Sequence, residues 1–485
     1  MSLLLPLRTL ALLAGSPAID AGNDNLCAAP PVNKVDERGF ARPGGSHCDI
    51  GSYELTYSNY NLPLLANNAT TAVGQTTTYI TFQNSGTNTA SVTVQYYSIT
   101  DGSAGPSEVI TIPTRGQKAI LPNIPTGSSY GGTVKSDQPL NLVVSEALGR
   151  GGSAYNVAAS TASTLYSPLA LNGQYNFTTR IIVFNTGTSG SSSGNIQFFD
   201  EQGNQSGQTQ AFNIPAHASR IFDQSAVGSG LTANHAYWAK ITADNPANNL
   251  TSQVIEFGPN NFVATFNAIV PSQLQSTLYA PAIFNGQFNF VTGLALANPN
   301  NVQANVSIKY YDVNGVLLLT QSVNIAANGT IGVFQPNVNG LSNRVSSATI
   351  ISTQPLIMAV NERGPGAVSG TYTGLATGKN LVSLPVIANG FAGFVTGATI
   401  LNIGSSSALI TLLYFDQAGN HIDQDQTQIL APNASFQVFQ GDGNQNLPSN
   451  FFGTAIVGSD QPVLVTTNAL NTSSGLFYTY TEPTP

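Results

Sequence analysis

The sequence contains little charge. Of its 485 residues, 15 are Lys or Arg and 23 are Asp or Glu, so 8% are charged, against about 25% in typical soluble domains. Nucleic-acid binding is excluded as a function class, because it requires clustered basic side chains and this chain has a net charge of -8 with scattered Lys and Arg residues. The same shortage excludes a charge-rich coiled coil and disorder driven by charge.

Cysteine and long apolar runs are also scarce. Cys27 and Cys48 are the only cysteines, so most of the chain folds without covalent crosslinks. We expect them to form a disulfide, and two reduced thiols are the alternative. No stretch approaches the roughly 20 apolar residues of a transmembrane helix. Residues 3–14 could be read as a short signal peptide, but Pro6 and Arg8 lie inside the apolar run and fit that interpretation poorly.

What remains is rich in Gly, Ser, Thr, Asn and Gln, and it is 41% hydrophobic with 23 Phe and 18 Tyr. Aromatic residues favour strands, and uncharged polar residues favour turns and exposed strand faces. The composition is typical of an extracellular β protein and predicts no cofactor.

Three motifs near the start of the chain suggest a family. They read LALLAGSPAIDAGN from Leu10, VDERGFARPGG from Val35 and CDIGSYE from Cys48. This order resembles the C-terminal end of bacterial right-handed parallel β-helix surface proteins of the "choice-of-anchor Q" type, over residues 7–55. The resemblance implies that residues 1–56 are a truncated β-helix cap, that the protein is extracellular or on the cell surface, and that Met1 lies inside a longer coding region.

Paired charges in this segment suit the polar end of a β-helix, where the last open coil must be closed. The predicted cap charges are Asp20, Asp36, Arg38, Arg42 and Asp49, accompanied by Glu37 and Glu54. Calcium binding by the clustered carboxylates is the alternative, but the spacing matches no known calcium loop.

The remaining residues contain an internal repeat in which four anchors recur in the same order. The first is a strand start with Pro63, Pro168, Pro281 or Pro385, spaced 105, 113 and 104 residues apart. The others are a strand ending in Asn, an aromatic pair as in VTVQYYS from Val92, and a turn with Pro as in SDQP from Ser136. The predicted domains are 57–163, 164–275, 276–379 and 380–485.

Period-two alternation identifies the class of each repeat. Val92, Val94 and Tyr96 share one strand face, with polar residues between them. Three copies continue into Asp-x-x-Gly turns at Asp200, Asp312 and Asp416. We therefore predict about seven strands per repeat and a linear array of four antiparallel, immunoglobulin-like β-sandwich domains. The prolines of the first anchor suit an edge strand.

The sequence offers little catalytic chemistry. His47, His217, His235 and His421 have no metal-ligand spacing, so we interpret them as isolated surface residues and predict no metal site. Glu146, Glu256 and Glu362 recur at comparable places, but repeat 4 has Ala469 there. One carboxylate per domain makes no acid–base pair, so we interpret these residues as strand-edge charges. The lone Trp238 is expected in the core.

One feature suggests ligand binding. The second aromatic of each pair points away from the core set by alternation: Tyr97, Phe199, Tyr311 and Phe415. Exposed, these rings could stack on sugars; the favoured alternative is that they pack beneath a loop or against the next domain.

The expected function is that of a non-enzymatic extracellular surface protein. Its repeats would form a stalk about 100 Å long, from strands of about 3.3 Å per residue, for adhesion or for presenting an upstream β-helix. Its partner would be a polysaccharide or a cell-surface protein. A carbohydrate-binding array and an accessory region of a β-helix polysaccharide-degrading enzyme are the alternatives.

Overall fold

The computed structural model describes residues 12, 16–37, 41–45, 47–71, 74–148, 151–157, 159–366, 368–441, 447–471 and 473–481. Among these residues antiparallel strands dominate, which confirms the predicted all-β class. Helix is limited to short segments, namely α1 (Asp24–Ala28), η1 (Val227–Ser229), η2 (Pro259–Asn261), η3 (Pro271–Gln273), η4 (Gln287–Asn289) and η5 (Gln335–Asn337).

The strands fall into four consecutive groups, which we call repeats 1 to 4. Repeat 1 contains β1 (Ser58–Asn67), β2 (Ala69–Thr71), β3 (Gly74–Asn84), β4 (Ala90–Ser98), β5 (Ala104–Ile112), β6 (Gln117–Ile120), β7 (Ser128–Ser136), β8 (Leu140–Leu148) and β9 (Gly151–Asn156). Repeat 2 contains β10 (Thr164–Gln174), β11 (Phe177–Asn185), β12 (Ser191–Phe199), β13 (Gln205–Pro215), β14 (Ser219–Asp223), β15 (His235–Ala243), β16 (Leu250–Phe257) and β17 (Val263–Asn267).

Repeats 3 and 4 have the same order of elements, with two strands merged into one long strand. Repeat 3 contains β18 (Gln275–Asn285), β19 (Val291–Ala297), β20 (Ala304–Tyr311), β21 (Leu317–Ile325), β22 (Thr330–Phe334), β23 (Arg344–Arg363) and β24 (Ser369–Thr373). Repeat 4 contains β25 (Lys379–Phe391), β26 (Phe394–Asn402), β27 (Ala408–Asp416), β28 (His421–Leu430), β29 (Ser435–Phe439), β30 (Phe451–Asn471) and β31 (Phe477–Thr481).

Each repeat pairs its strands in two sets. In repeat 1 the outer set has the order β1-β7-β4-β5, and the inner set has the order β6-β3-β8-β9, with the short β2 also paired to β3. Repeat 2 follows the same pattern with β10-β15-β12-β13 and β14-β11-β16-β17. In repeats 3 and 4 the long strands β23 and β30 take part in both sets. In each repeat the strand that comes last in the sequence lies at one edge of the inner set. These last strands are β9, β17, β24 and β31, and they contact one another.

A separate hydrophobic cluster lies in each repeat and takes side chains from both sets of strands. The predicted core face of the third anchor is buried: Val92, Val94 and Tyr96 are 0% exposed. The Pro-containing strands have a register shift at the proline in all four repeats, for example between Leu62 and Leu65 around Pro63. A bulge tolerates proline because the unpaired residue needs no ladder hydrogen bond.

The asparagine of the second anchor also has the same role in every repeat. Its buried side chain donates from Nδ2 to a backbone carbonyl of the strand that follows the aromatic pair. The pairs are Asn84 with Ile112 at 3.0 Å, Asn185 with Ile214 at 2.9 Å, Asn298 with Ile325 at 3.4 Å and Asn402 with Leu430 at 3.0 Å. This recurring bond fixes the loop between the two strand sets.

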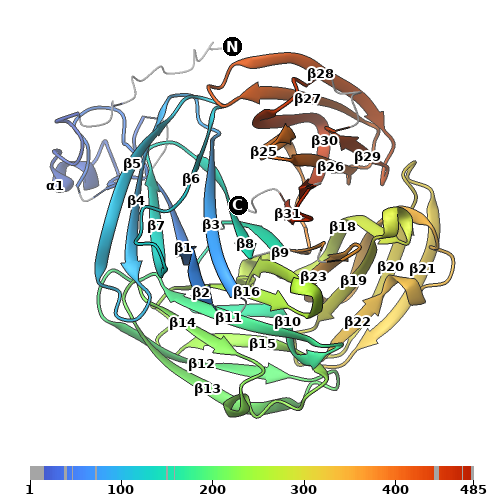
Figure 1. Cartoon of the computed structure of the whole chain (residues 1–485). Helices are drawn as coiled ribbons and strands as arrows, with labels where there is room; N and C mark the ends of the chain where they lie inside the picture. The colour runs from blue at the N-terminus through green and yellow to red at the C-terminus, as the bar shows by residue number, and fades with distance from the viewer. Residues whose placement is uncertain are drawn as a thin grey trace.

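The four repeats form a closed ring, and the last strands β9, β17, β24 and β31 meet around its centre (Figure 1). Neighbouring last strands are joined by hydrogen bonds. The hydroxyl oxygens of Ser153 in β9 and Thr265 in β17 lie 2.7 Å apart, and Ser369 Oγ of β24 donates to the Val263 carbonyl of β17 at 3.0 Å. The Thr481 amide of β31 donates to Asn156 Oδ1 of β9 at 2.9 Å, so repeat 4 contacts repeat 1.

The predicted linear array is therefore wrong. In each repeat the turn that follows the aromatic pair inserts into the next repeat, and repeat 4 does the same to repeat 1. At the first junction a Cβ at Gly102 would collide with the Ala216 carbonyl, and at the last one a Cβ at Gly419 would collide with the Thr114 carbonyl. Because each contact turns the chain in the same sense, four repeats return to their starting point.

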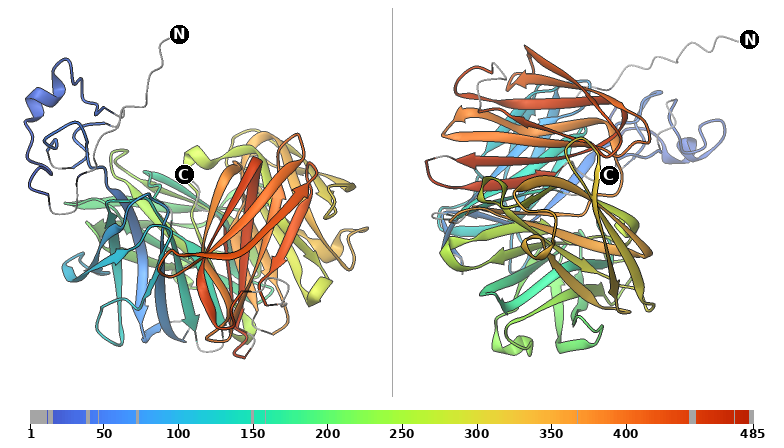
Figure 2. Two further views of the ribbon diagram at one scale, coloured as in Figure 1. Left: turned by 90° about the horizontal axis from the view of Figure 1, so that it is seen from above. Right: turned by 90° about the vertical axis from the view of Figure 1, so that its right-hand side faces the viewer.

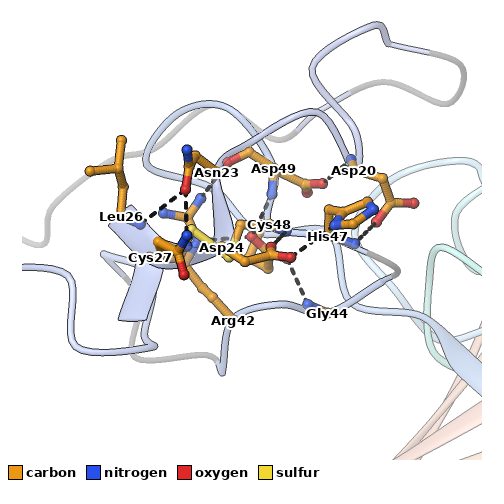
Figure 3. The surroundings of a disulfide bond; sticks show 12 residues. Asp20, Asn23, Asp24, Leu26, Cys27, Arg42, Gly44, His47, Cys48 and Asp49 are labelled. Carbon is orange, nitrogen blue, oxygen red and sulfur yellow. Dashed lines mark hydrogen bonds and ion pairs between the residues drawn. A yellow bond between two sulfur atoms is a disulfide. The ribbon is translucent and has the colours of Figure 1, made fainter. Parts of the chain in front are cut away.

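The N-terminal segment lies beside the ring, next to repeat 1 (Figure 2). It contains the expected disulfide between Cys27 and Cys48 (Figure 3). Arg42 is buried, forms an ion pair with Glu54 at 2.8 Å and donates to the Asp49 and Gly51 carbonyls at 3.1 and 2.7 Å. These bonds connect loops that have little apolar core of their own.

The other predicted cap charges accept backbone hydrogen bonds. Asp49 accepts from the Asp20 amide at 2.7 Å, Asp36 accepts from the Glu54 amide at 3.1 Å, and Asp20 accepts from the His47 amide at 3.0 Å. Arg38 lies outside the described residues. In the described part of the chain no group of three or more His, Cys, Asp or Glu residues could hold a metal ion.

Candidate functional site: the junctions between repeats

The four junctions place one position of each inner strand set against the neighbouring repeat. This position is Glu146 in β8, Glu256 in β16, Glu362 in β23 and Ala469 in β30. The four are equivalent by register, because each lies opposite a buried threonine of the adjacent strand, namely Thr78, Thr179, Thr292 and Thr396. We call Glu146, Glu256 and Glu362 the junction glutamates.

At the junction of repeats 1 and 2, Glu146 accepts three side-chain hydrogen bonds. One comes from Ser153 of its own repeat at 2.9 Å. The other two come from repeat 2, from Gln253 Nε2 at 3.0 Å and from Thr265 Oγ1 at 2.8 Å. The residue is 2% exposed. It thus joins the two repeats through a buried polar contact.

At the junction of repeats 2 and 3, Glu256 accepts from Asn361 Nδ2 at 2.9 Å and forms an ion pair with Arg363 at 3.0 Å. The Arg363 guanidinium also lies over the Phe177 ring, 3.8 Å from its centroid. Because Phe177 belongs to repeat 2, Arg363 of repeat 3 holds both a carboxylate and an aromatic face of its neighbour.

At the junction of repeats 3 and 4, Glu362 has only neutral partners. Asn468 Nδ2 donates to its Oε2 at 2.9 Å, and the Thr479 hydroxyl lies 3.5 Å from the same oxygen. The residue is 0% exposed, and its Oε1 has no hydrogen-bond partner among the described residues.

Burial dominates the electrostatics of all three glutamates. It raises the pKa of Glu146 and of Glu256, although the hydrogen bonds to Glu146 and the Arg363 charge beside Glu256 act in the opposite direction. Burial raises the pKa of Glu362 to about 8, because two neutral donors offset little of the desolvation cost. The sequence-based interpretation of these residues as strand-edge charges is therefore wrong: each side chain points into the neighbouring repeat, not into solvent.

The junction of repeats 4 and 1, which we call the closing junction, has no glutamate. Ala469 takes its place, and the residue paired with it is Tyr478. Repeat 1, which faces Ala469 across this junction, also differs from the other repeats. By register, Ala154 of repeat 1 lies where Thr265, Thr371 and Thr479 lie in the other repeats. Both the acceptor and a hydroxyl donor are thus missing from this junction.

Other contacts hold the closing junction together. The Gln117 amide donates to the Gln417 carbonyl at 3.0 Å, and Thr454 Oγ1 donates to the Arg115 carbonyl at 3.1 Å. Gln117 Nε2 donates to the Pro385 carbonyl, and also to the Gly453 carbonyl at 3.2 Å. A small apolar cluster of Val143, Ala154 and Tyr480 lies between the two repeats.

The aromatic residues predicted as ligand platforms lie beside these junctions. Tyr97 stacks on His217 of repeat 2 with ring centroids 4.2 Å apart, and Phe199 stacks on Trp238 at 4.6 Å. Phe415 is 2% exposed and lies beneath Arg115 of repeat 1. Tyr311 is half-buried. Tyr97 and Phe415 therefore pack against the neighbouring repeat, as the alternative interpretation expected. Phe415 is too buried to serve as an exposed platform for a ligand.

The histidines are less uniform than expected. His235 and His421 are exposed, and His47 is exposed with its ring nitrogen 2.8 Å from Asp24. His217 is half-buried, and desolvation lowers its pKa. It is a packing residue of the first junction, not an isolated surface residue. Trp238 is buried as expected, but it lies between repeats 2 and 3 and donates to the Asn328 carbonyl at 2.6 Å.

Sequence reasoning missed the partners of the junction glutamates. The recurrence of Glu in three repeats was visible, and so was Ala469 in the fourth. The donors Gln253, Asn361 and Asn468 lie 107, 105 and 106 residues further along the chain. A search for polar residues one repeat length away from each glutamate could have found them.

Comparisons with known proteins add little. No family model and no curated protein matches the chain. A solved structure of Thermotoga maritima 1070 is similar over 21% of this chain and 92% of that chain, at 16% identity and a TM-score of 0.19. Dimeric latent PorU from Porphyromonas gingivalis is similar over 70% of this chain and 31% of that chain, at 9% identity and a TM-score of 0.13. At these scores neither likeness supports an argument. No helix in the described part of the chain has the length and hydrophobicity of a membrane span.

Proposed function

We propose that the chain is a non-enzymatic extracellular surface protein. In this proposal four immunoglobulin-like β-sandwich repeats form a rigid ring, joined to the C-terminal cap of a β-helix. The observation that carries the proposal is the contact of repeat 4 with repeat 1 through side chains and backbone. A chain whose last repeat is bonded to its first serves as a compact platform and not as an extended stalk.

The use of the polar side chains supports a non-enzymatic role. The junction glutamates are buried and hydrogen-bonded inside interfaces, where they hold neighbouring repeats together. An acid–base pair would need two carboxyl groups facing a substrate cleft. The three carboxyl groups instead serve three different junctions.

The disulfide supports an extracellular location, because such bonds persist in oxidising compartments. The cap segment lies at the side of the ring near repeat 1 (Figure 2). An upstream β-helix would therefore be carried at the rim of the ring. Adhesion to a cell-surface protein or polysaccharide would use the outer faces of the repeats.

The location and size of the native polypeptide test this proposal. Cell, surface and medium fractions should be immunoblotted with antiserum to residues 57–485. We expect a surface band well above the 50.5 kDa of this chain, as a protein with a β-helix upstream requires. A band confined to the cytoplasmic fraction would contradict the proposal.

Ring closure is tested separately by small-angle scattering of the chain. A compact protein of this length has a radius of gyration of about 23 Å. Four modules in line over about 100 Å would give about 30 Å or more. A value near the larger figure would show that the repeats do not close in solution.

A further inference from the structure

A cavity opens at the closing junction, between repeats 4 and 1. Its volume is about 600 Å³, inside the range of about 300–1,000 Å³ that small-molecule sites occupy. Tyr79 and Leu121 of repeat 1 and Phe391 of repeat 4 line it and are 44%, 44% and 37% exposed. The cavity is thus open to solvent at these side chains.

The two walls of the cavity differ. The repeat 1 wall carries mainly small residues, among them Ala119, Ala147 and Ala154. The repeat 4 wall is aromatic and holds its rings in nearly parallel pairs. Phe391 and Phe452 have centroids 4.6 Å apart with planes 13° from parallel, and Phe394 and Tyr478 are 5.2 Å and 19° apart. Small residues opposite fixed aromatic faces leave room for a flat group between them.

Among the residues that the structure describes, no charged one lines this cavity. Two other junction cavities differ in this respect: Glu146 and Arg180 line the one between repeats 1 and 2, and Glu201 and Arg363 line the one between repeats 2 and 3. The difference follows from the changes in sequence. In comparison with the cavity between repeats 1 and 2, Ala469 replaces a junction glutamate, and by register Tyr79 lies where repeat 2 has Arg180. In comparison with the cavity between repeats 2 and 3, Ala147 lies by register where repeat 3 has Arg363. The repeat pattern is therefore altered at the one junction where the cavity is largest among these three.

We propose that the cavity at the closing junction binds an uncharged, flat and predominantly apolar small molecule. Its ring faces would lie against the aromatic pairs of repeat 4, and its edge would reach the hydroxyl groups of Thr81 and Ser145. An ionised ligand would leave its charge without a partner in an apolar site, which is costly. A sugar would meet few polar groups for its hydroxyls there. This inference does not depend on the proposed surface role.

Two matched fluorescent probes test the ligand class. N-phenyl-1-naphthylamine is neutral, and 1-anilinonaphthalene-8-sulfonate has the same ring skeleton with a negative charge. Titration into the folded chain should show one saturable site for the neutral probe. The sulfonate should bind at least about tenfold more weakly. Equal affinity for the two probes, or displacement of the neutral probe by a neutral disaccharide, would overturn the proposed ligand class.

Variants locate the site. Tyr79→Arg introduces the residue that repeat 2 has at the same register, and the exposed position tolerates it. It should weaken binding of the neutral probe at least about tenfold. The control is Tyr175→Arg, the same change at a 78% exposed tyrosine that lines the cavity between repeats 2 and 3; it should leave the dissociation constant unchanged. Loss of binding in both variants, or only in the control, would overturn the assignment.

Discussion

The three junctions between consecutive repeats and the closing junction solve the same packing problem differently. Consecutive repeats are joined by a buried glutamate that accepts hydrogen bonds from side chains of the next repeat. The closing junction has alanine at the glutamate position and at a donor position, and it relies on apolar contact and bonds to backbone carbonyls. Buried polar groups need particular partners, whereas apolar surfaces tolerate many. The glutamates therefore favour the correct neighbour at three junctions, and closure follows from geometry.

The two kinds of junction also differ in the space that they leave for a ligand. The cavity between repeats 1 and 2, which Glu146 lines, has a volume of about 330 Å³. The closing junction exchanges the glutamate contact for small residues and aromatic walls, and its cavity has a volume of about 600 Å³. Departures from a repeated pattern are expected at functional positions, so the irregular junction is the one to which we assign ligand binding.

The largest effect should come from removing the charged partner of a junction glutamate. Arg363→Met leaves Glu256 buried beside Asn361 alone and removes the cation from the Phe177 ring. We expect a loss of about 3–5 kcal/mol in the free energy of unfolding, measured by denaturant titration at neutral pH. Arg344→Met, at the exposed start of the same strand β23, is the control and should change it by less than about 0.5 kcal/mol. Similar losses for the two variants would show that the Glu256 contact contributes little.

A pH-dependent effect should follow from Glu362. Its folded pKa, about 8, lies above the value of about 4.3 in an unfolded chain. The folded state therefore binds more protons between these values, and stability falls as pH rises from about 4.5 to about 8. Glu362→Gln should remove this loss, raising the free energy of unfolding by about 2 kcal/mol or more at pH 9 relative to the native chain.

The measurement is the denaturant midpoint of both chains at pH 5 and pH 9, with Glu201→Gln at an exposed turn as the control. At pH 5 the native carboxyl is protonated, so the Glu362 variant should gain little. Parallel pH profiles for the native chain and Glu362→Gln would contradict a raised pKa at this position.

A smaller effect should come from building a glutamate contact at the closing junction. Ala469→Glu alone places a carboxylate opposite Ala154 and should cost about 1–3 kcal/mol. Adding Ala154→Thr supplies the hydroxyl that repeats 2 to 4 have at this register. A double-mutant cycle in thermal or denaturant unfolding should give a favourable coupling of about 0.5–2 kcal/mol. Strictly additive effects would show that the equivalence by register does not extend to the contact itself.

The sequence predicted the regular parts of the repeats well. Alternation along VTVQYYS identified a strand whose Val92, Val94 and Tyr96 are fully buried, because the side-chain period of a strand is a local property. The recurring prolines were expected in edge strands; β1 is one, but β10 lies between β15 and β11 and accommodates its proline by a bulge. The two cysteines were expected to form a disulfide, and they do.

The sequence did not reveal the roles of residues at the junctions. Phe415 alternates toward the face opposite the local core, and from one strand such a face is indistinguishable from a solvated one. Glu146 alternates onto the same face as the buried Leu142 and Val144, but two of its donors come from repeat 2. In both cases the neighbouring repeat covers the side chain. Their burial follows from how the repeats are arranged, and alternation carries no information on that.

The sequence by itself determined the all-β class, the four repeats and their core faces, because these depend on periodicity, turn residues and composition within one repeat. Only the tertiary structure decided that the repeats close into a ring, that three glutamates are buried between them, and that the closing junction holds the largest of three junction cavities. These features depend on the angle between successive repeats and on pairs of residues one repeat length apart. The angle arises from many weak contacts summed over each interface, and no short motif encodes it.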